Sequence, residues 1–294
     1  MLSSQRWREM GLLVKKVAVI TDAISPEFFF PRWQRYYGGL FGQENLHVIT
    51  YAGMKPLFRD VQVGNIWEVN RPYDDKLRVD LIADFIAVLL NSYDVVLRCD
   101  VDEFLFPDPA RFLNLADFVE KNMQPYVTAR GVDVIELEDD PPLDSNAPVL
   151  GNQRHYGLRS AALNKTCLTT VPLRWAPGFH GANASPHFSY LYNFHLKWAD
   201  IKARIIWNEK MLTGLTPGTS EHTYFAVGAE HLLSVAKFFS NKPKLGEETE
   251  GEFDRRFLGS VNVHQESQIY QGEFITQDFL FSLEKQFNTP AADF

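Results

Sequence analysis

The segment YDVVLRCDVDEFLFPDP, residues 93–109, places three carboxylates between two apolar runs. The first run leads into Asp100, Asp102 and Glu103, and the second, Phe104–Phe106, follows at once. An unpaired buried charge is strongly disfavoured, so these carboxylates require a cation or a chemical role. The alternative is a solvated acidic turn that follows a strand.

The rest of the first 110 residues alternates between strand-like and helix-like patterns. Apolar residues at helical spacing cover 74–92, and a helix-like segment at 25–41 ends at its Gly-Gly pair. Short apolar runs of buried-strand type occupy 16–21, 46–51, 65–70 and 94–99. The order strand, helix, strand, strand, helix, strand predicts an α/β fold with a mainly parallel sheet. Ligands bind beyond the carboxyl ends of such strands, so Asp22 and Asp100 are predicted to share one rim.

The pattern loosens in the second half of the chain. A helix is predicted at 111–122, a strand at 131–138 and a Pro-rich loop at 139–152. Residues 211–294 form a region that is predicted to be mostly helical, with its best helix candidate at 229–241.

Composition excludes several classes of protein. The 294 residues are 45% hydrophobic and carry a net charge of −8, without the basic excess of a general nucleic-acid binder. Two cysteines, Cys99 and Cys167, exclude a disulfide framework and favour a reducing compartment. No stretch reaches the roughly 18 uninterrupted apolar residues that a transmembrane helix requires. We therefore expect a soluble protein without a transmembrane segment, located in the cytoplasm.

The carboxylates of the 93–109 segment suit a divalent cation. If the segment is extended, Asp100 and Asp102 project to the same side about 7 Å apart, and Glu103 turns away. Two carboxylates at a strand end suit Mg²⁺ or Mn²⁺, which is typically retained together with water and phosphate oxygens. Such an ion neutralises a diphosphate leaving group.

Three ordered segments together resemble the glycosyltransferase family 2-like group, whose fold is called GT-A. The first is VVLRCDVDEFLFPDP, which is similar to the D-x-D-E-F segment of that group. The second, NKTCLTTVPLRWAPGFHGA, contains Lys165 and the element Gly178-Phe179-His180. The third, YLYNFHLKWADIKARI, contains His195, Lys197 and Arg204. The resemblance extends from about residue 16 to residue 210.

The resemblance implies a metal-dependent transferase. It would move a sugar, with inversion, from a nucleotide-sugar donor to a glycan, a lipid-linked acceptor at the membrane surface or another hydroxyl acceptor. The implied fold is a Rossmann-like nucleotide-binding sheet in a catalytic domain at 1–210, divided near residue 110 into donor and acceptor halves. Residues 211–294 would form a mostly helical extension. The implied metal ligands are Asp100, Asp102 and His195, and the implied contacts to the nucleotide-sugar are Asp22, Lys76, Arg78, Asp100 and Lys165.

Several residues compete for the role of catalytic base, which takes a proton from the acceptor hydroxyl. His180 lies in the turn PGFHG, where a side chain is more plausibly functional than in a core stripe. Glu138 and Asp139 end a strand-like run before Pro141-Pro142, although a solvated acidic loop explains them too. Glu209 is a further carboxylate, and no candidate is favoured decisively. For His195 the alternative is a core histidine, and for His222 a plain connector between elements.

Two other classes of function compete with a transferase. Phosphatases of the haloacid dehalogenase type also carry D-x-D after a strand, but they require Thr or Val where this chain has Phe104. A non-catalytic domain that binds a glycan or a partner protein would have no reason to keep both Asp100 and Asp102.

Overall fold

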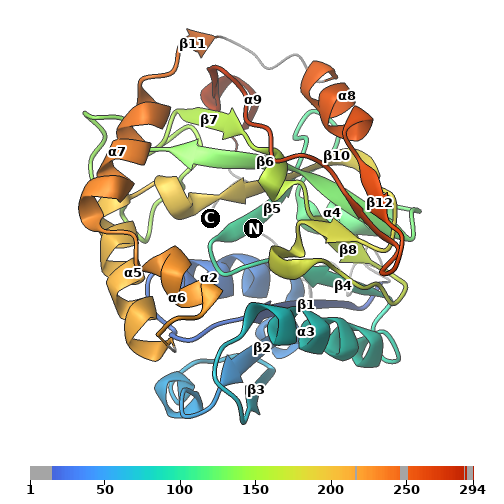
Figure 1. Cartoon of the computed structure of the whole chain (residues 1–294). Helices are drawn as coiled ribbons and strands as arrows, with labels where there is room; N and C mark the ends of the chain where they lie inside the picture. Colours follow the sequence, from blue (N-terminus) through green and yellow to red (C-terminus); the bar gives the residue numbers. More distant parts are fainter. Residues whose placement is uncertain (1–14, 216, 246–250, 288, 290–293) are drawn as a thin grey trace.

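The computed structural model describes residues 15–215, 217–245, 251–287, 289 and 294. Its strands form one mixed sheet of 11 strands and a second sheet of three strands, with helices packed around them (Figure 1). The protein is therefore an α/β protein, as the order of the sequence patterns predicts.

Four of the predicted strands form a parallel unit at one end of the large sheet. They are β1 (Val17–Asp22), β2 (Leu46–Tyr51), β3 (Asn65–Val69) and β4 (Val95–Arg98), in the spatial order β3-β2-β1-β4. Neighbouring strands of this unit run parallel to one another. Every residue of β1, β2 and β4 is buried, which explains their continuous apolar runs.

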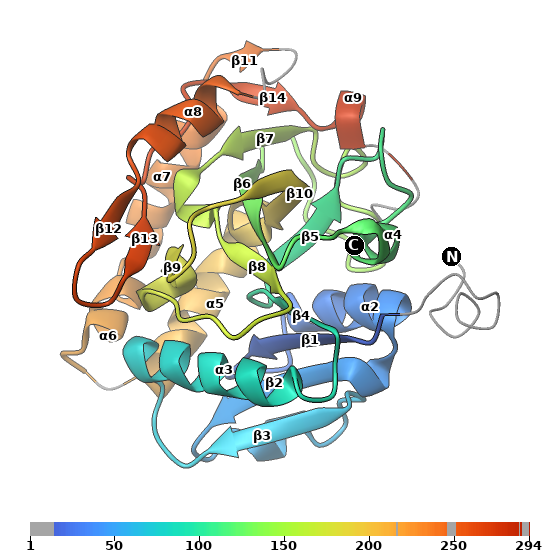
Figure 2. The ribbon, with the colours of Figure 1, turned by 90° about the vertical axis from the view of Figure 1, so that its right-hand side faces the viewer.

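Two helices cover opposite faces of this parallel unit (Figure 2). Helix α2 (Phe30–Phe41) packs with Val17 and Val19 of β1, whereas α3 (Asp75–Leu89) packs with the alternate residues of the strand. The N-cap of α3 is Asp74, whose carboxylate accepts a hydrogen bond from the Leu77 N–H at 2.7 Å. Helix α2 continues through its Gly-Gly pair rather than ending there, so that detail of the prediction is wrong.

The remainder of the large sheet is mixed, so the expectation of a mainly parallel sheet is confirmed only for β1 to β4. Strand β8 pairs antiparallel with both β4 and β6, and β6 pairs antiparallel with β7. Strand β5 follows β4 after a short turn and pairs antiparallel with β10, which also runs parallel to β6. The bounds of these strands are β5 Glu103–Pro107, β6 Tyr126–Ile135, β7 Tyr156–Arg159, β8 Thr166–Thr169 and β10 Phe188–His195.

The C-terminal region combines helices with strands. Its β14 pairs with β7 in the large sheet, and its side chains Phe281, Leu283 and Phe287 belong to the main hydrophobic core. Its strands are β11 Lys244–Leu245, β12 Asn262–His264, β13 Ile269–Gln271 and β14 Leu280–Ser282. Strand β13 also pairs with the earlier strand β9, Gly181–Ala182. The remaining helices are α4 Leu115–Lys121, α5 Ile201–Gly214, α6 Ser220–Phe225, α7 Ala229–Ser240, α8 Glu252–Gly259 and α9 Glu284–Phe287.

Two features of composition take a definite form in the structure. Both cysteines are buried and free, and Cys99 accepts a hydrogen bond from the indole N–H of Trp33 at 3.3 Å. In the part of the chain that is described, no helix has both the length and the apolar character needed to cross a bilayer.

Candidate functional site

A cavity of about 500 Å³ opens at the carboxyl ends of β1 and β4. The prediction that Asp22 and Asp100 share one rim is confirmed, because both line this cavity and one side chain, Arg78 of α3, binds both. Arg78 Nε lies 2.8 and 2.9 Å from the two carboxylate oxygens of Asp22. Tyr51 also donates its hydroxyl to Asp22, at 3.1 Å.

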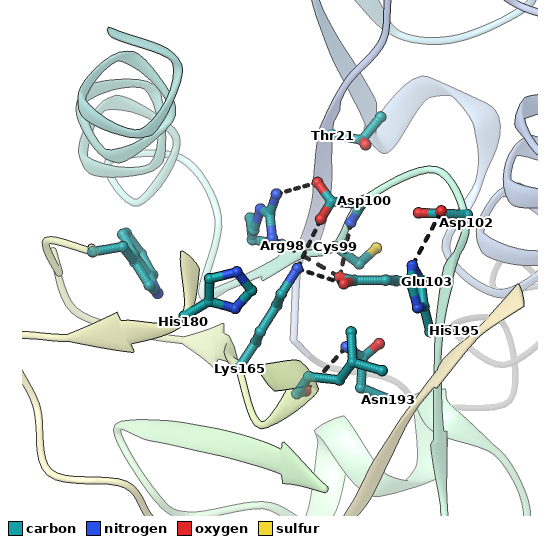
Figure 3. Close-up of polar contacts among 12 residues, drawn as sticks. Thr21, Arg98, Cys99, Asp100, Asp102, Glu103, Lys165, His180, Asn193 and His195 are labelled. Atoms are coloured by element: carbon teal, nitrogen blue, oxygen red, sulfur yellow. Dashed lines mark hydrogen bonds and ion pairs between the residues drawn. The ribbon is translucent and has the colours of Figure 1, made fainter. Parts of the chain in front are cut away.

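Three cations surround the carboxylate of Asp100, and two of them, Arg98 and Lys165, are visible in Figure 3. Arg78 and Arg98 both donate to Oδ1, and Lys165 Nζ lies 2.8 Å from Oδ2. Burial raises the pKa of Asp100, but these three cations lower it more, so the net pKa lies well below the usual range of an aspartate. Asp100 is therefore an ionised group with both oxygens occupied.

The expectation that Asp100 and Asp102 face one side while Glu103 turns away is wrong. The segment makes a turn, in which the Glu103 N–H donates to the Asp100 carbonyl at 3.0 Å, and is not extended. Glu103 consequently shares Lys165 with Asp100, at 2.5 Å from Nζ, and its side chain is fully buried. Asp102 points the other way, toward His195 (Figure 3).

His195 lies between two carboxylates. Its Nε2 is 3.2 Å from Asp102 Oδ2, and its Nδ1 is 2.8 Å from Asp133 Oδ1. The sheet explains this arrangement, because β10 runs between β5 and β6 and places His195 opposite Glu103 and Asp133. Burial lowers the pKa of His195, but Asp102 and Asp133 raise it more, to about 10. Burial alone would raise the pKa of Asp102, but the neighbouring His195 lowers it more.

His180 closes another side of the cavity and stays neutral. Burial and the charge of Lys165 lower the pKa of His180 to about 4. Its Nδ1 lies 2.6 Å from the carbonyl oxygen of Ala162, so Nδ1 carries the proton and Nε2 is left as an acceptor. Gly178 makes room for this ring, since a Cβ at that position would lie 2.4 Å from Nε2.

The ring of Phe179 packs against the guanidinium groups of Arg78 and Arg98. Phe179 is fully buried with a left-handed φ of 60°, and its ring lies 3.2 Å from Arg98 Cζ and 5.0 Å from Arg78 Cζ. A non-glycine residue in this conformation is strained. The stacking of the Phe179 ring on the guanidinium groups stabilises this conformation. The turn PGFHG thus supports the charged wall of the cavity as well as placing His180.

Another part of the lining, beside the charged wall, is largely apolar and aromatic. Tyr73, from the loop before α3, and Trp207, from α5, lie against the same small core cluster. Other apolar lining residues are Ile24, Phe29, Met211 and Phe225. Such a wall beside a charged one suits a ligand with a flat apolar part and an anionic part.

The charged wall offers a partial metal site. Within the described ranges, no group of three or more His, Cys, Asp or Glu side chains is arranged to hold a metal ion. Asp102 and His195 nevertheless fit two ligand positions, with Asp133 orienting the imidazole through Nδ1 as carboxylates do behind metal-bound histidines. Asp100 fits less well, since cations occupy both of its oxygens. A metal here would complete its coordination with water and phosphate oxygens.

Some predicted residues lie outside the cavity. Five of them do not line it, and four of these five are exposed, namely Lys76, Glu138, Asp139 and Glu209. The fifth is His222, which is partly buried. The structure thus brings together Asp22, Arg78, Asp100, Asp102, Lys165, His180 and His195.

Other site residues carried no sequence signal strong enough to single them out as part of a site. Asp133 occurs in the middle of a predicted strand, where an acidic residue in a buried run was the only sign. Tyr73, Trp207 and Tyr224 are aromatic residues in a chain already rich in them. Arg204 stood in the third resembling segment without a role assigned to it.

Comparison with known proteins adds no assignment, because no protein-family model matches the chain and no curated protein matches it.

Proposed function

We propose that this protein is a metal-dependent glycosyltransferase that uses a nucleotide-sugar donor and a glycan, lipid-linked or other hydroxyl acceptor. The observation that carries the proposal is the cavity at the ends of β1 and β4, with an aromatic wall beside a charged wall. A nucleoside would lie on the aromatic wall near Tyr73 and Trp207. Its diphosphate would lie on the charged wall near Asp102 and His195.

The balance of charge in the cavity supports a requirement for metal. Five carboxylates line it, and they face the cations Arg78, Lys165, Arg204 and protonated His195, with Arg98 behind Asp100. The protein therefore offers an anionic diphosphate almost no net positive charge. A divalent ion at Asp102 and His195 would displace the Nε2 proton of His195 and still add net positive charge. It would stabilise the charge that develops on the leaving diphosphate.

The protein's own residues would position the acceptor. His180 lines the cavity as a neutral imidazole with Nε2 as an acceptor, so it can take a hydrogen bond from an acceptor hydroxyl. Glu138 and Asp139 lie outside the cavity lining. We therefore propose His180, rather than either carboxylate, as the group that holds the acceptor hydroxyl. A comparison of donor and acceptor turnover in His180→Asn and Asp139→Asn tests this choice.

The competing functions have less support. A phosphatase of the haloacid dehalogenase type needs an aspartate free to attack, whereas both oxygens of Asp100 are occupied by cations. A purely structural or partner-binding domain gives no reason for the buried Asp102–His195–Asp133 arrangement at a cavity wall.

Nucleotide binding and donor hydrolysis test the proposed function directly. The melting temperature should rise when Mn²⁺ or Mg²⁺ is added together with one of UDP, GDP or CMP, and nucleotide-sugar hydrolysis should require the same metal. Asp102→Asn should abolish both effects, because it removes a proposed metal ligand. The matched control is Asp80→Asn, on the exposed face of α3. A full response in Asp102→Asn, or no response in the unmodified protein with any nucleotide, would contradict the proposal.

A further inference from the structure

The cations at the Asp100 end of the cavity already have anionic partners within the protein. Arg78 binds Asp22 and Asp100, and Lys165 binds Asp100 and Glu103. Lys165 lies 2.8 Å from Asp100 and 2.5 Å from Glu103. A phosphate that bound these cations would have to compete with buried carboxylates, which is costly.

Arg204 of α5 is different. It lines the cavity and is only 4% exposed, and no carboxylate of the described residues forms a salt bridge with it. Its guanidinium carbon lies 5.6 Å from the centre of the Phe225 ring, and its buried Nε has no hydrogen-bond partner among the described residues. Burial lowers the pKa of Arg204 more than Tyr224 and Asp102 raise it. The side chain is thus a buried cation with incomplete compensation.

Tyr224 of α6 stands between two cations. Its hydroxyl oxygen accepts a hydrogen bond from Lys197 Nζ. Burial raises the pKa of Tyr224, but the charges of Lys197 and Arg204 lower it more. Because the hydroxyl oxygen accepts from Lys197, its own proton is left for an outside acceptor. Tyr224 lines the cavity, whereas Lys197 does not. The Lys197–Tyr224–Arg204 cluster therefore presents donors and positive charge without a carboxylate of its own.

We propose that the Lys197–Tyr224–Arg204 cluster is a phosphate subsite. Arg204 and the Tyr224 hydroxyl would donate to the phosphate oxygens, and Lys197 would add charge through Tyr224. The cluster adjoins Asp102, whose pKa Arg204 lowers after the larger influence of His195, so the phosphate would lie between Arg204 and the proposed metal site. Assignment of this phosphate to the nucleotide-sugar donor rests on the proposed function, and a phosphorylated lipid acceptor offers the same chemistry.

Calorimetric titration with inorganic pyrophosphate tests the subsite without knowledge of the donor base. Titrations are made with EDTA and again with Mg²⁺, so that binding is read apart from any metal-loaded activity. Arg204→Gln should weaken binding about 10- to 100-fold, as expected for loss of a charge-assisted hydrogen bond. Arg204→Lys, which retains the charge, should lose less. The control is Lys202→Gln, an exposed cation of the same helix, which should bind as the unmodified protein does.

The outcomes separate the possibilities. Equal pyrophosphate binding by Arg204→Gln and the unmodified protein, with unchanged melting temperatures, would overturn the subsite, as would a complete lack of binding at millimolar pyrophosphate. A parallel loss of UDP, GDP or CDP binding in Arg204→Gln assigns the phosphate to the donor. A loss confined to a short-chain prenyl phosphate assigns it to the acceptor. Arg204-dependent pyrophosphate binding without any nucleotide-sugar hydrolysis would leave the subsite standing and remove the transferase proposal.

Discussion

Replacement of Lys165 by methionine gives the sharpest test of the charged wall. The ammonium group is buried and lies 2.8 Å from Asp100 and 2.5 Å from Glu103. Methionine fills a similar volume but leaves Glu103 fully buried, with Arg98 Nη1 at 3.9 Å as its remaining cation. Removal of one partner from a buried ion pair costs about 3–5 kcal/mol, which for a chain of this size lowers the melting temperature by roughly 5–15 °C.

The loss of stability should depend on pH with a definite sign. In the unmodified protein the pKa of Asp100 is depressed, so its stabilising contribution is present above the unfolded pKa of about 4 and is lost as pH falls. Lys165 is one of the cations that depress this pKa, so its removal weakens the stabilising contribution of Asp100. The variant should therefore lose more stability at pH 7 than at pH 3, where the Asp100 carboxyl of the unfolded chain is largely protonated.

Urea unfolding of the two proteins at pH 3 and pH 7 measures this difference. A second variant, Lys165→Met combined with Glu103→Gln, should recover much of the lost free energy of unfolding, because no unpaired carboxylate is left at that position. A loss below about 1 kcal/mol that does not change with pH would refute the interpretation that Lys165 neutralises these carboxylates.

Four further predictions concern the histidines and the turn that supports them. Asp133→Asn should lower the pKa of His195 from about 10, as followed by NMR titration of the ring; an unchanged pKa would exclude this contact. Because that pKa lies above the unfolded value of about 6.5, the stability advantage over His195→Gln should be full below pH 6.5 and vanish as pH rises through about 10. His180 has a pKa of about 4, so His180→Phe should lessen the stability lost between pH 6.5 and pH 4, measured by urea unfolding. Gly178→Ala should cost about 1–2 kcal/mol or more, because φ is 67° and the new Cβ meets the His180 ring. Gly218→Ala, with φ of 88° and open space around it, should show the backbone cost alone.

The order of apolar runs along the chain was sufficient to predict the parallel unit and the rim at its carboxyl ends. Continuous apolar runs specify β1, β2 and β4, because a strand buried on both faces can carry no polar alternation. Asp74 begins α3 through its own side chain, which is a local interaction. Since parallel strands end at one edge, the proximity of Asp22 and Asp100 followed from strand order alone.

The rest of the sheet and the inner geometry of the site depend on contacts between segments that are far apart in the sequence. Hydrophobic periodicity reports local burial, whereas the pairing of β10 with β5 and β6 depends on segments more than 60 residues apart. That pairing alone brings Asp133 to His195.

The direction of each carboxylate in the 93–109 segment depended on the tertiary structure for the same reason. An extended backbone and a turn are both compatible with these residues locally, and they orient Glu103 oppositely. The buried ammonium of Lys165, 62 positions further along the chain, binds Asp100 and Glu103 together in the turn that forms. The sequence could therefore locate the charged cluster but not say which carboxylates face one another, because that depends on Lys165, which lies just before β8 and far from the cluster in sequence.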